Sequence, residues 1–172
     1  MVNIGFIGLG IMGKPMAGHL IEEGHALFLH SRSGVPDDLV ARGGRACATA
    51  KEVAQQADVI ITMLPNTADV ECVLFGDNGI MEGLACHPDI SKIVIDMSSI
   101  SPLKTRDFAA RLKAQAHDYV DAPVSGGDVG AQNASLTIMV GAEAEVFEKV
   151  KPILELMGNS VTRIGLNGAG QI

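Results

Sequence analysis

The chain has 172 residues, of which 47% are hydrophobic and 19% charged, so it is long and apolar enough for one globular domain rather than a disordered segment. Its formal net charge of −7 argues against a nucleic-acid partner or an anionic membrane surface. No apolar run approaches the roughly 18 residues that a membrane-spanning helix needs.

The first predicted element is an apolar strand that runs directly into three glycines. Gly8, Gly10 and Gly13 have the G-x-G-x-x-G spacing of a dinucleotide-binding turn between a strand and a helix. The first glycine permits the tight bend, the second lets a pyrophosphate approach the backbone, and the third lets the helix pack on the strand. A tight turn without a ligand is the alternative. The predicted cofactor-binding segment is Gly8, Leu9, Gly10, Ile11, Met12 and Gly13.

Strand and helix patterns then alternate along the chain. Apolar runs predict strands over residues 26–30, 59–64, 93–97, 119–121, 136–140 and 161–164. Capping and proline signals predict helices that begin near Pro36, Thr49, Thr67, Ser101 and Glu143. The last helix is expected to run to Met157 with a kink at Pro152. The alternation predicts an α/β fold, a doubly wound Rossmann-type and mostly parallel sheet over residues 1–164.

Ligands of such sheets bind beyond the carboxyl ends of the strands, so the residue types found there predict the cofactor. After the second strand there is no carboxylate to accept a hydrogen bond from a ribose 2′-hydroxyl. Ser31 and Arg32 instead offer donors for a 2′-phosphate, which favours NADP over NAD. Alternatively, Arg32 is a solvated loop residue stacked on adenine, and both cofactors stay open.

A second polar stretch, Asp121–Gly127, follows the strand predicted at 119–121. The backbone N–H groups of Gly126 and Gly127, with the hydroxyl of Ser125, can form a nest for a small carboxylate. A glycine turn that merely ends the strand is an equally good interpretation. Asp121 can likewise serve only to cap the loop that follows.

Four separate stretches resemble the β-hydroxyacid dehydrogenase family: residues 8–17, 63–66, 96–102 and 121–127. The resemblance implies that Leu64, Pro65 and Asn66 line the adenosine side of the cofactor and that Ser99 lies near the nicotinamide. It also implies that Ser125, Gly126 and Gly127 hold the substrate carboxylate. The family's catalytic lysine follows a glycine-rich turn like Gly168–Gly170 and is expected beyond Ile172. Residues 165–172 would begin the connection to an all-helical domain, and the full-length protein would be a homo-oligomer.

The function expected on this basis is NAD(P)-dependent reduction of a small carboxylic-acid aldehyde. The chain alone is expected to bind the cofactor but to turn over little substrate. Three alternatives remain: an activity like that of the 3-hydroxyisobutyrate dehydrogenases within the same family, an imine reductase, and a non-enzymatic dinucleotide-binding module. The three cysteines form no C-x-x-C pair, so they are expected to be reduced thiols without a metal site; they are Cys47, Cys72 and Cys86. With no signal-peptide pattern at the start, a cytoplasmic location without a membrane partner is expected.

Overall fold

The computed structural model describes all 172 residues as an α/β fold around one nine-stranded sheet. Its first six strands lie in the order β3-β2-β1-β4-β5-β6, each parallel to its neighbours. They are β1 (Asn3–Ile7), β2 (Ala26–His30), β3 (Arg45–Ala46), β4 (Val59–Thr62), β5 (Ile93–Asp96) and β6 (Asp118–Asp121). The strand order reverses between β1 and β4, which is the arrangement of doubly wound dinucleotide-binding folds. The predicted fold class is confirmed.

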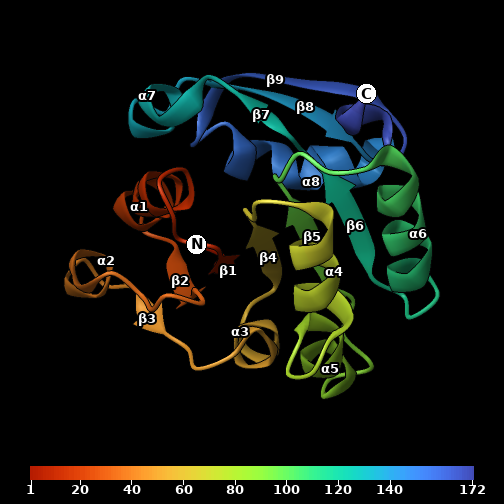
Figure 1. Cartoon of the computed structure of the whole chain (residues 1–172), viewed down its shortest axis with the longest axis horizontal. Coiled ribbons are helices and arrows are strands. Elements are labelled where there is room, and N and C mark those ends of the chain that lie inside the picture. The colour runs from red at the N-terminus through yellow and green to blue at the C-terminus, as the bar shows by residue number, and fades with distance from the viewer.

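Helices cover both faces of this sheet (Figure 1). The connections between the parallel strands contain α1 (Gly13–Glu22), α2 (Asp37–Ala41), α3 (Ala50–Gln56), α4 (Thr67–Phe75), α5 (Ile80–Ala85) and α6 (Pro102–Lys113). Alternate side chains of one strand enter different cores: Ile61 belongs to the same buried cluster as Met16 of α1, whereas Ile60 belongs to the cluster that contains Phe108 of α6. Because both faces of β4 are covered, its first three residues are all apolar and its one polar residue, Thr62, is buried with a hydrogen-bond partner. None of the helices has the length and apolar character needed to cross a membrane.

The last third of the chain extends the sheet with strands of mixed direction. It contains β7 (Val124–Ser125), α7 (Gly127–Gln132), β8 (Leu136–Gly141), α8 (Ala144–Leu154), β9 (Gly158–Gly165) and the 3-10 turn η1 (Ala169–Gln171). β8 is antiparallel to β6 and β7 and parallel to β9. α7 lies beside α1, whereas the C-terminus lies beside α6 (Figure 1).

Several predicted boundaries are wrong in this last third. The helix predicted over 143–157 is shorter and continues through Pro152 to Leu154, and the strand predicted over 161–164 begins at Gly158. A side chain on Gly158 would collide with the carbonyl oxygen of Leu136, so this glycine permits close pairing of β9 with β8, whereas the helix already ends at Leu154. The two-residue strands β3 and β7 and the six-residue helices α5 and α7 were not predicted, because they are too short to show a periodic pattern.

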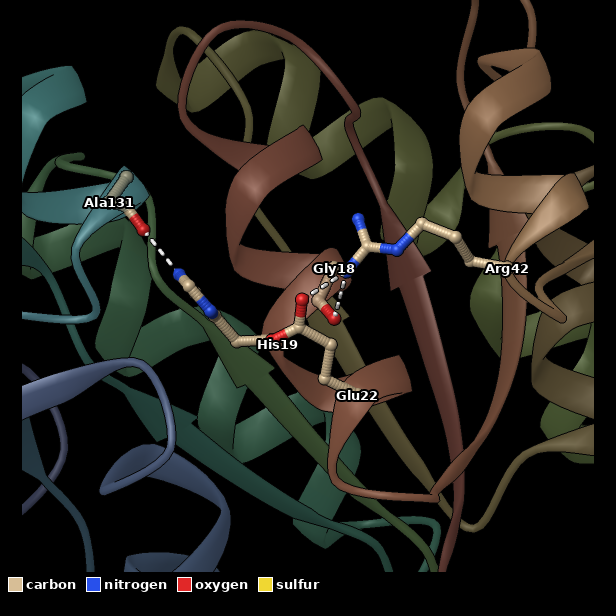
Figure 2. Close-up of polar contacts among 5 residues, drawn as sticks. All are labelled: Gly18, His19, Glu22, Arg42 and Ala131. Carbon is tan, nitrogen blue, oxygen red and sulfur yellow. Dashed lines mark hydrogen bonds and ion pairs between the residues drawn. The ribbon is translucent and has the colours of Figure 1, made fainter.

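Two polar contacts hold α1 from opposite sides (Figure 2). His19 Nε2 donates to the carbonyl oxygen of Ala131 in α7 at 2.8 Å. Arg42, which follows α2, donates to the carbonyl oxygen of Gly18 at 3.1 Å and to Glu22 Oε1 at 2.9 Å. Since α1 begins at the end of the glycine turn, these contacts fix the orientation of the helix on which that turn depends.

Candidate functional site

The three glycines between β1 and α1 have the different environments that their spacing predicts. Gly8 has a positive φ of 101°, and an added Cβ would collide with the carbonyl oxygen of Met63. A Cβ on Gly13 would collide with the carbonyl oxygen of Gly8, so the helix packs against the turn. Around Gly10 no atom lies within 4 Å of an added Cβ, which leaves its backbone open to a ligand.

The start of α1 has a group of unpaired backbone donors. The N–H groups of Gly10, Ile11, Met12 and Gly13 make no hydrogen bond within the chain, and the first N–H groups to be paired are those of Lys14 and Met16. The ten-residue helix adds a partial positive charge at this end. Such an arrangement binds phosphate groups.

These donors border a cavity of about 870 Å³ at the carboxyl ends of β1, β2 and β4. Ten of the residues predicted to bind the cofactor line this cavity: Gly8, Leu9, Gly10, Ile11, Met12, Gly13, Ser31, Arg32, Leu64 and Pro65. The volume of this cavity falls in the range of about 300–1,000 Å³ that is usual for ligand pockets, so the cavity is large enough for a dinucleotide-sized ligand. The residues and the open backbone at Gly10 therefore fit a dinucleotide, and the individual roles stay predictions.

Two residues predicted for the cofactor site lie outside the lining of this cavity. Asn66 is the N-cap of α4, and its Oδ1 accepts from Asp69 N at 2.8 Å. The sequence favoured Thr67 as this cap, but its hydroxyl accepts from Ser101 N at 3.1 Å. Ser99 is exposed between β5 and α6, and its side chain makes no hydrogen bond within the chain.

Three lining residues of α4 were missed by sequence reasoning: Asp69, Cys72 and Val73. They have i, i+3, i+4 spacing and so share one face of the helix. Asp69 Oδ1 is 3.9 Å from Arg32 Nη1, and the arginine side chain is 87% exposed. The end of β2 has no carboxylate, but Asp69 of α4 places one in the wall of the cavity. The signal that would have found it is the helical periodicity after Pro65.

The predicted anion nest lies at the start of α7 and does not line the cavity. Ser125 pairs with Thr137 of β8, and its hydroxyl makes no hydrogen bond within the chain. Gly126 and Gly127 have φ values of 136° and 63°, a conformation that favours glycine. α7 packs beside α1, so the nest is carried by a helix in contact with the helix of the glycine turn.

A buried polar network lies below the ends of β4, β5 and β6. Asp96 is fully buried and accepts from Thr62 Oγ1 at 2.9 Å, Ser98 N at 3.1 Å and Tyr119 Oη at 3.1 Å. Burial raises the pKa of the Asp96 carboxyl to about 6, although these hydrogen bonds act in the opposite direction. Ser98 Oγ in turn accepts from Leu64 N at 2.8 Å, which connects the network to the cavity wall.

Residues 3–165 match a family model described as the NAD binding domain of 6-phosphogluconate dehydrogenase. The chain is also 46% identical over 170 residues to 2-hydroxy-3-oxopropionate reductase of Escherichia coli (strain K12), a match that covers 99% of the chain and 57% of that enzyme. The chain belongs to the β-hydroxyacid dehydrogenase family. It binds NAD or NADP, and the family's enzymes are oxidoreductases that act on CH–OH groups.

Solved structures of other proteins agree with this membership in the β-hydroxyacid dehydrogenases. Mycobacterium tuberculosis 3-hydroxyisobutyrate dehydrogenase with L-serine has a TM-score of 0.84 and 32% identity, covering 99% of the chain and 57% of that protein. Psf3 in complex with NADP+ and 2-OPP has a TM-score of 0.88 and 28% identity, covering 98% and 58%. An imine reductase from Myxococcus stipitatus, covering 98% and 56%, has a TM-score of 0.85 but only 19% identity, which shows the shared fold alone.

The chain spans less than two thirds of the length of these relatives, 57% of the Escherichia coli enzyme. Residues 165–171 nevertheless pack onto the sheet. Asp121 Oδ1 accepts from Gly168 N at 2.9 Å, and its Oδ2 accepts from Gly170 N at 3.0 Å. The side chain of Asp121 therefore holds the terminal turn, a contact across 47 and 49 residues of sequence, rather than only capping the loop that follows it.

Proposed function

We propose that the protein to which this chain belongs is an NAD(P)-dependent reductase of a small aldehyde acid, with tartronate semialdehyde as substrate and D-glycerate as product. The observation that carries the proposal is the group of four unpaired N–H donors at the start of α1, which borders a cavity of about 870 Å³. The substrate is proposed from the name of the Escherichia coli relative, 2-hydroxy-3-oxopropionate reductase.

Each part of the proposed site has a separate task. The N–H groups from Gly10 to Gly13 would bind the pyrophosphate, and Leu64 and Pro65 would pack against the adenosine. Ser99 would lie near the nicotinamide, which supplies a hydride when the reduced cofactor is bound. Ser125, Gly126 and Gly127 would hold the substrate carboxylate through the free hydroxyl and backbone N–H groups.

The proton for the carbonyl oxygen is assigned to a lysine beyond Ile172. A positioned general acid contributes about 10²- to 10⁴-fold to such a reaction. The 172-residue chain is therefore expected to bind cofactor while it turns over little substrate. The domain boundary near residue 165 and a homo-oligomeric full-length enzyme belong to the same proposal.

A close alternative is an activity like that of 3-hydroxyisobutyrate dehydrogenase, which is the named enzyme of the Mycobacterium tuberculosis structure. Both candidate substrates are short acids with an oxygen on the carbon next to the α-carbon. The proposed carboxylate nest would serve either. The choice between them depends on groups that contact the α-carbon substituent.

Calorimetric titration of the chain with NADPH and with NADH tests the proposal. Binding of at least one cofactor is expected, and Gly10→Val should abolish it while leaving the unfolding midpoint unchanged, because its side chain projects into open space. Oxidation of NADPH with tartronate semialdehyde is measured alongside. A folded chain that binds neither cofactor contradicts the proposal, and rapid turnover by the chain alone contradicts the assignment of the acid to a residue beyond Ile172.

A further inference from the structure

The turn formed by residues 168–171 is tightly fitted against the sheet. Its backbone is held by Asp121, whose side chain is completely buried in β6. A Cβ on Gly170 would lie 2.6 Å from the carbonyl oxygen of Met139 and 2.9 Å from Asp121 Oδ2, so the turn packs too closely on the sheet to admit a side chain at this position. Gly168, with a φ of 94°, supplies the bend that brings the chain back.

From this fixed turn, the side chain of Gln171 reaches the loop between β5 and α6. Its Nε2 donates to the carbonyl oxygen of Ser98 at 2.7 Å, and its Oε1 accepts from the N–H of Ile100 at 3.0 Å. One planar carboxamide therefore binds the peptide groups on both sides of Ser99. Both bonds have good distances, and together they restrict the backbone dihedrals of Ser99.

The same loop is tied to the cofactor cavity on its other side. Ser98 Oγ accepts from Leu64 N at 2.8 Å, and Leu64 lines the cavity. Ser98 N donates to the buried carboxylate of Asp96. Of the three loop residues, only Ser99 is exposed with a side chain that has no partner in the chain. The surrounding bonds thus hold the backbone on both sides of Ser99 and leave its hydroxyl free.

We propose that Gln171 is a positioning residue that holds Ser98–Ile100 in the conformation that receives the nicotinamide end of the cofactor. This inference rests on the proposed function, and it adds a residue more than 70 positions away in sequence from the loop that it positions. Ordering the loop in advance reduces the conformational cost of binding. The effect should therefore appear only with ligands that contact the loop.

The test compares each cofactor with its analogue that lacks the nicotinamide. Gln171→Ala should weaken binding of NADPH, or of NADH if only that binds, by about five- to tenfold, as expected for two lost hydrogen bonds. Binding of 2′-phospho-ADP-ribose or ADP-ribose should change less than about twofold by the same relation. Gln171→Glu, which keeps the shape but replaces the donor with an acceptor, should also weaken cofactor binding.

Gln115→Ala, at an exposed position beyond α6, is the matched control and should bind like the wild type. Hydrogen exchange of the Ile100 amide should accelerate in Gln171→Ala, which checks that the contact exists in solution. Equal weakening of cofactor and analogue would reveal a general structural role and overturn the inference, as would unchanged binding of both. A wild-type chain that binds neither ligand overturns the proposed function and the inference with it.

Discussion

Arg32 and Asp69 put opposite charges at the same end of the cofactor cavity. Their side-chain atoms approach to 3.9 Å, but Arg32 is 87% exposed and Asp69 26% exposed, so the pair itself contributes little stability. A 2′-phosphate carries about two negative charges. It would be attracted by Arg32 and repelled by Asp69, and we propose that the balance between these residues sets the preference between NADP and NAD.

Substitutions of Asp69 and of Arg32 should shift the preference between NADP and NAD in opposite directions. Asp69→Asn should raise the ratio of NADPH to NADH affinity by about two- to fivefold, and Arg32→Gln should lower it by a similar factor, since exposed charges contribute about 1 kcal/mol or less. Calorimetry with both cofactors measures the ratio. Arg45→Gln, which lies in β3 and outside the cavity lining, is the control. A ratio that both variants leave unchanged would show that the preference arises elsewhere.

At the scale of elements, α1 connects the glycine turn with two neighbouring parts of the fold. The His19 bond reaches α7, whose first residue belongs to the proposed carboxylate nest. The Arg42 bonds reach back from the turn after α2 (Figure 2). Because the His19 contact and the Arg42 contacts lie on opposite sides of α1, a substitution can remove one without affecting the other.

His19→Ala and Arg42→Ala should each lower the free energy of unfolding by about 1 kcal/mol, the usual net contribution of one hydrogen bond, because the second bond of Arg42, to Glu22, is an exposed ion pair that adds little. Hydrogen exchange should distinguish their effects, with faster exchange in α7 for His19→Ala and around Gly43 and Gly44 for Arg42→Ala. His87→Ala, whose side chain is exposed without a hydrogen bond, should change neither. Faster exchange over both regions in either variant would mean that α1 moves as a whole and that the His19 and Arg42 contacts do not act independently.

The elements that sequence predicted well are those whose signals are local. The glycine turn and β2 follow from adjacent residues, and ten of the twelve residues predicted for the cofactor line one cavity. The cap of α4 was misassigned because Asn66 and Thr67 are both good caps, and a bond from Ser101 decides between them. The partners of Gln171 and Asp121 lie 47 to 73 residues away, and no local pattern announces them.

For the whole molecule, Asp96 makes the stability of the fold depend on pH. Its carboxyl is fully buried in the middle of the sheet, and burial raises its pKa from 3.8 to about 6. Between these two values the folded state keeps a proton that the unfolded state loses. Protonated Asp96 therefore contributes its full stabilisation of the folded state below about pH 4, and this contribution is lost as the pH rises through about 6. Burial raises the pKa of Asp121 as well, so its contribution has the same sign.

Asp96→Asn should remove this component of the pH dependence. A shift of about two units corresponds to about 3 kcal/mol, most of which is lost between about pH 4.5 and 7.5. Over that range the wild type should lose about 2 kcal/mol more of its free energy of unfolding than Asp96→Asn, as measured by urea denaturation. The comparison uses the change with pH, so it holds even if the amide fits the three donors less well and lowers stability at every pH. Parallel pH profiles would mean that Asp96 titrates near its ordinary pKa, with its three hydrogen bonds outweighing the effect of burial.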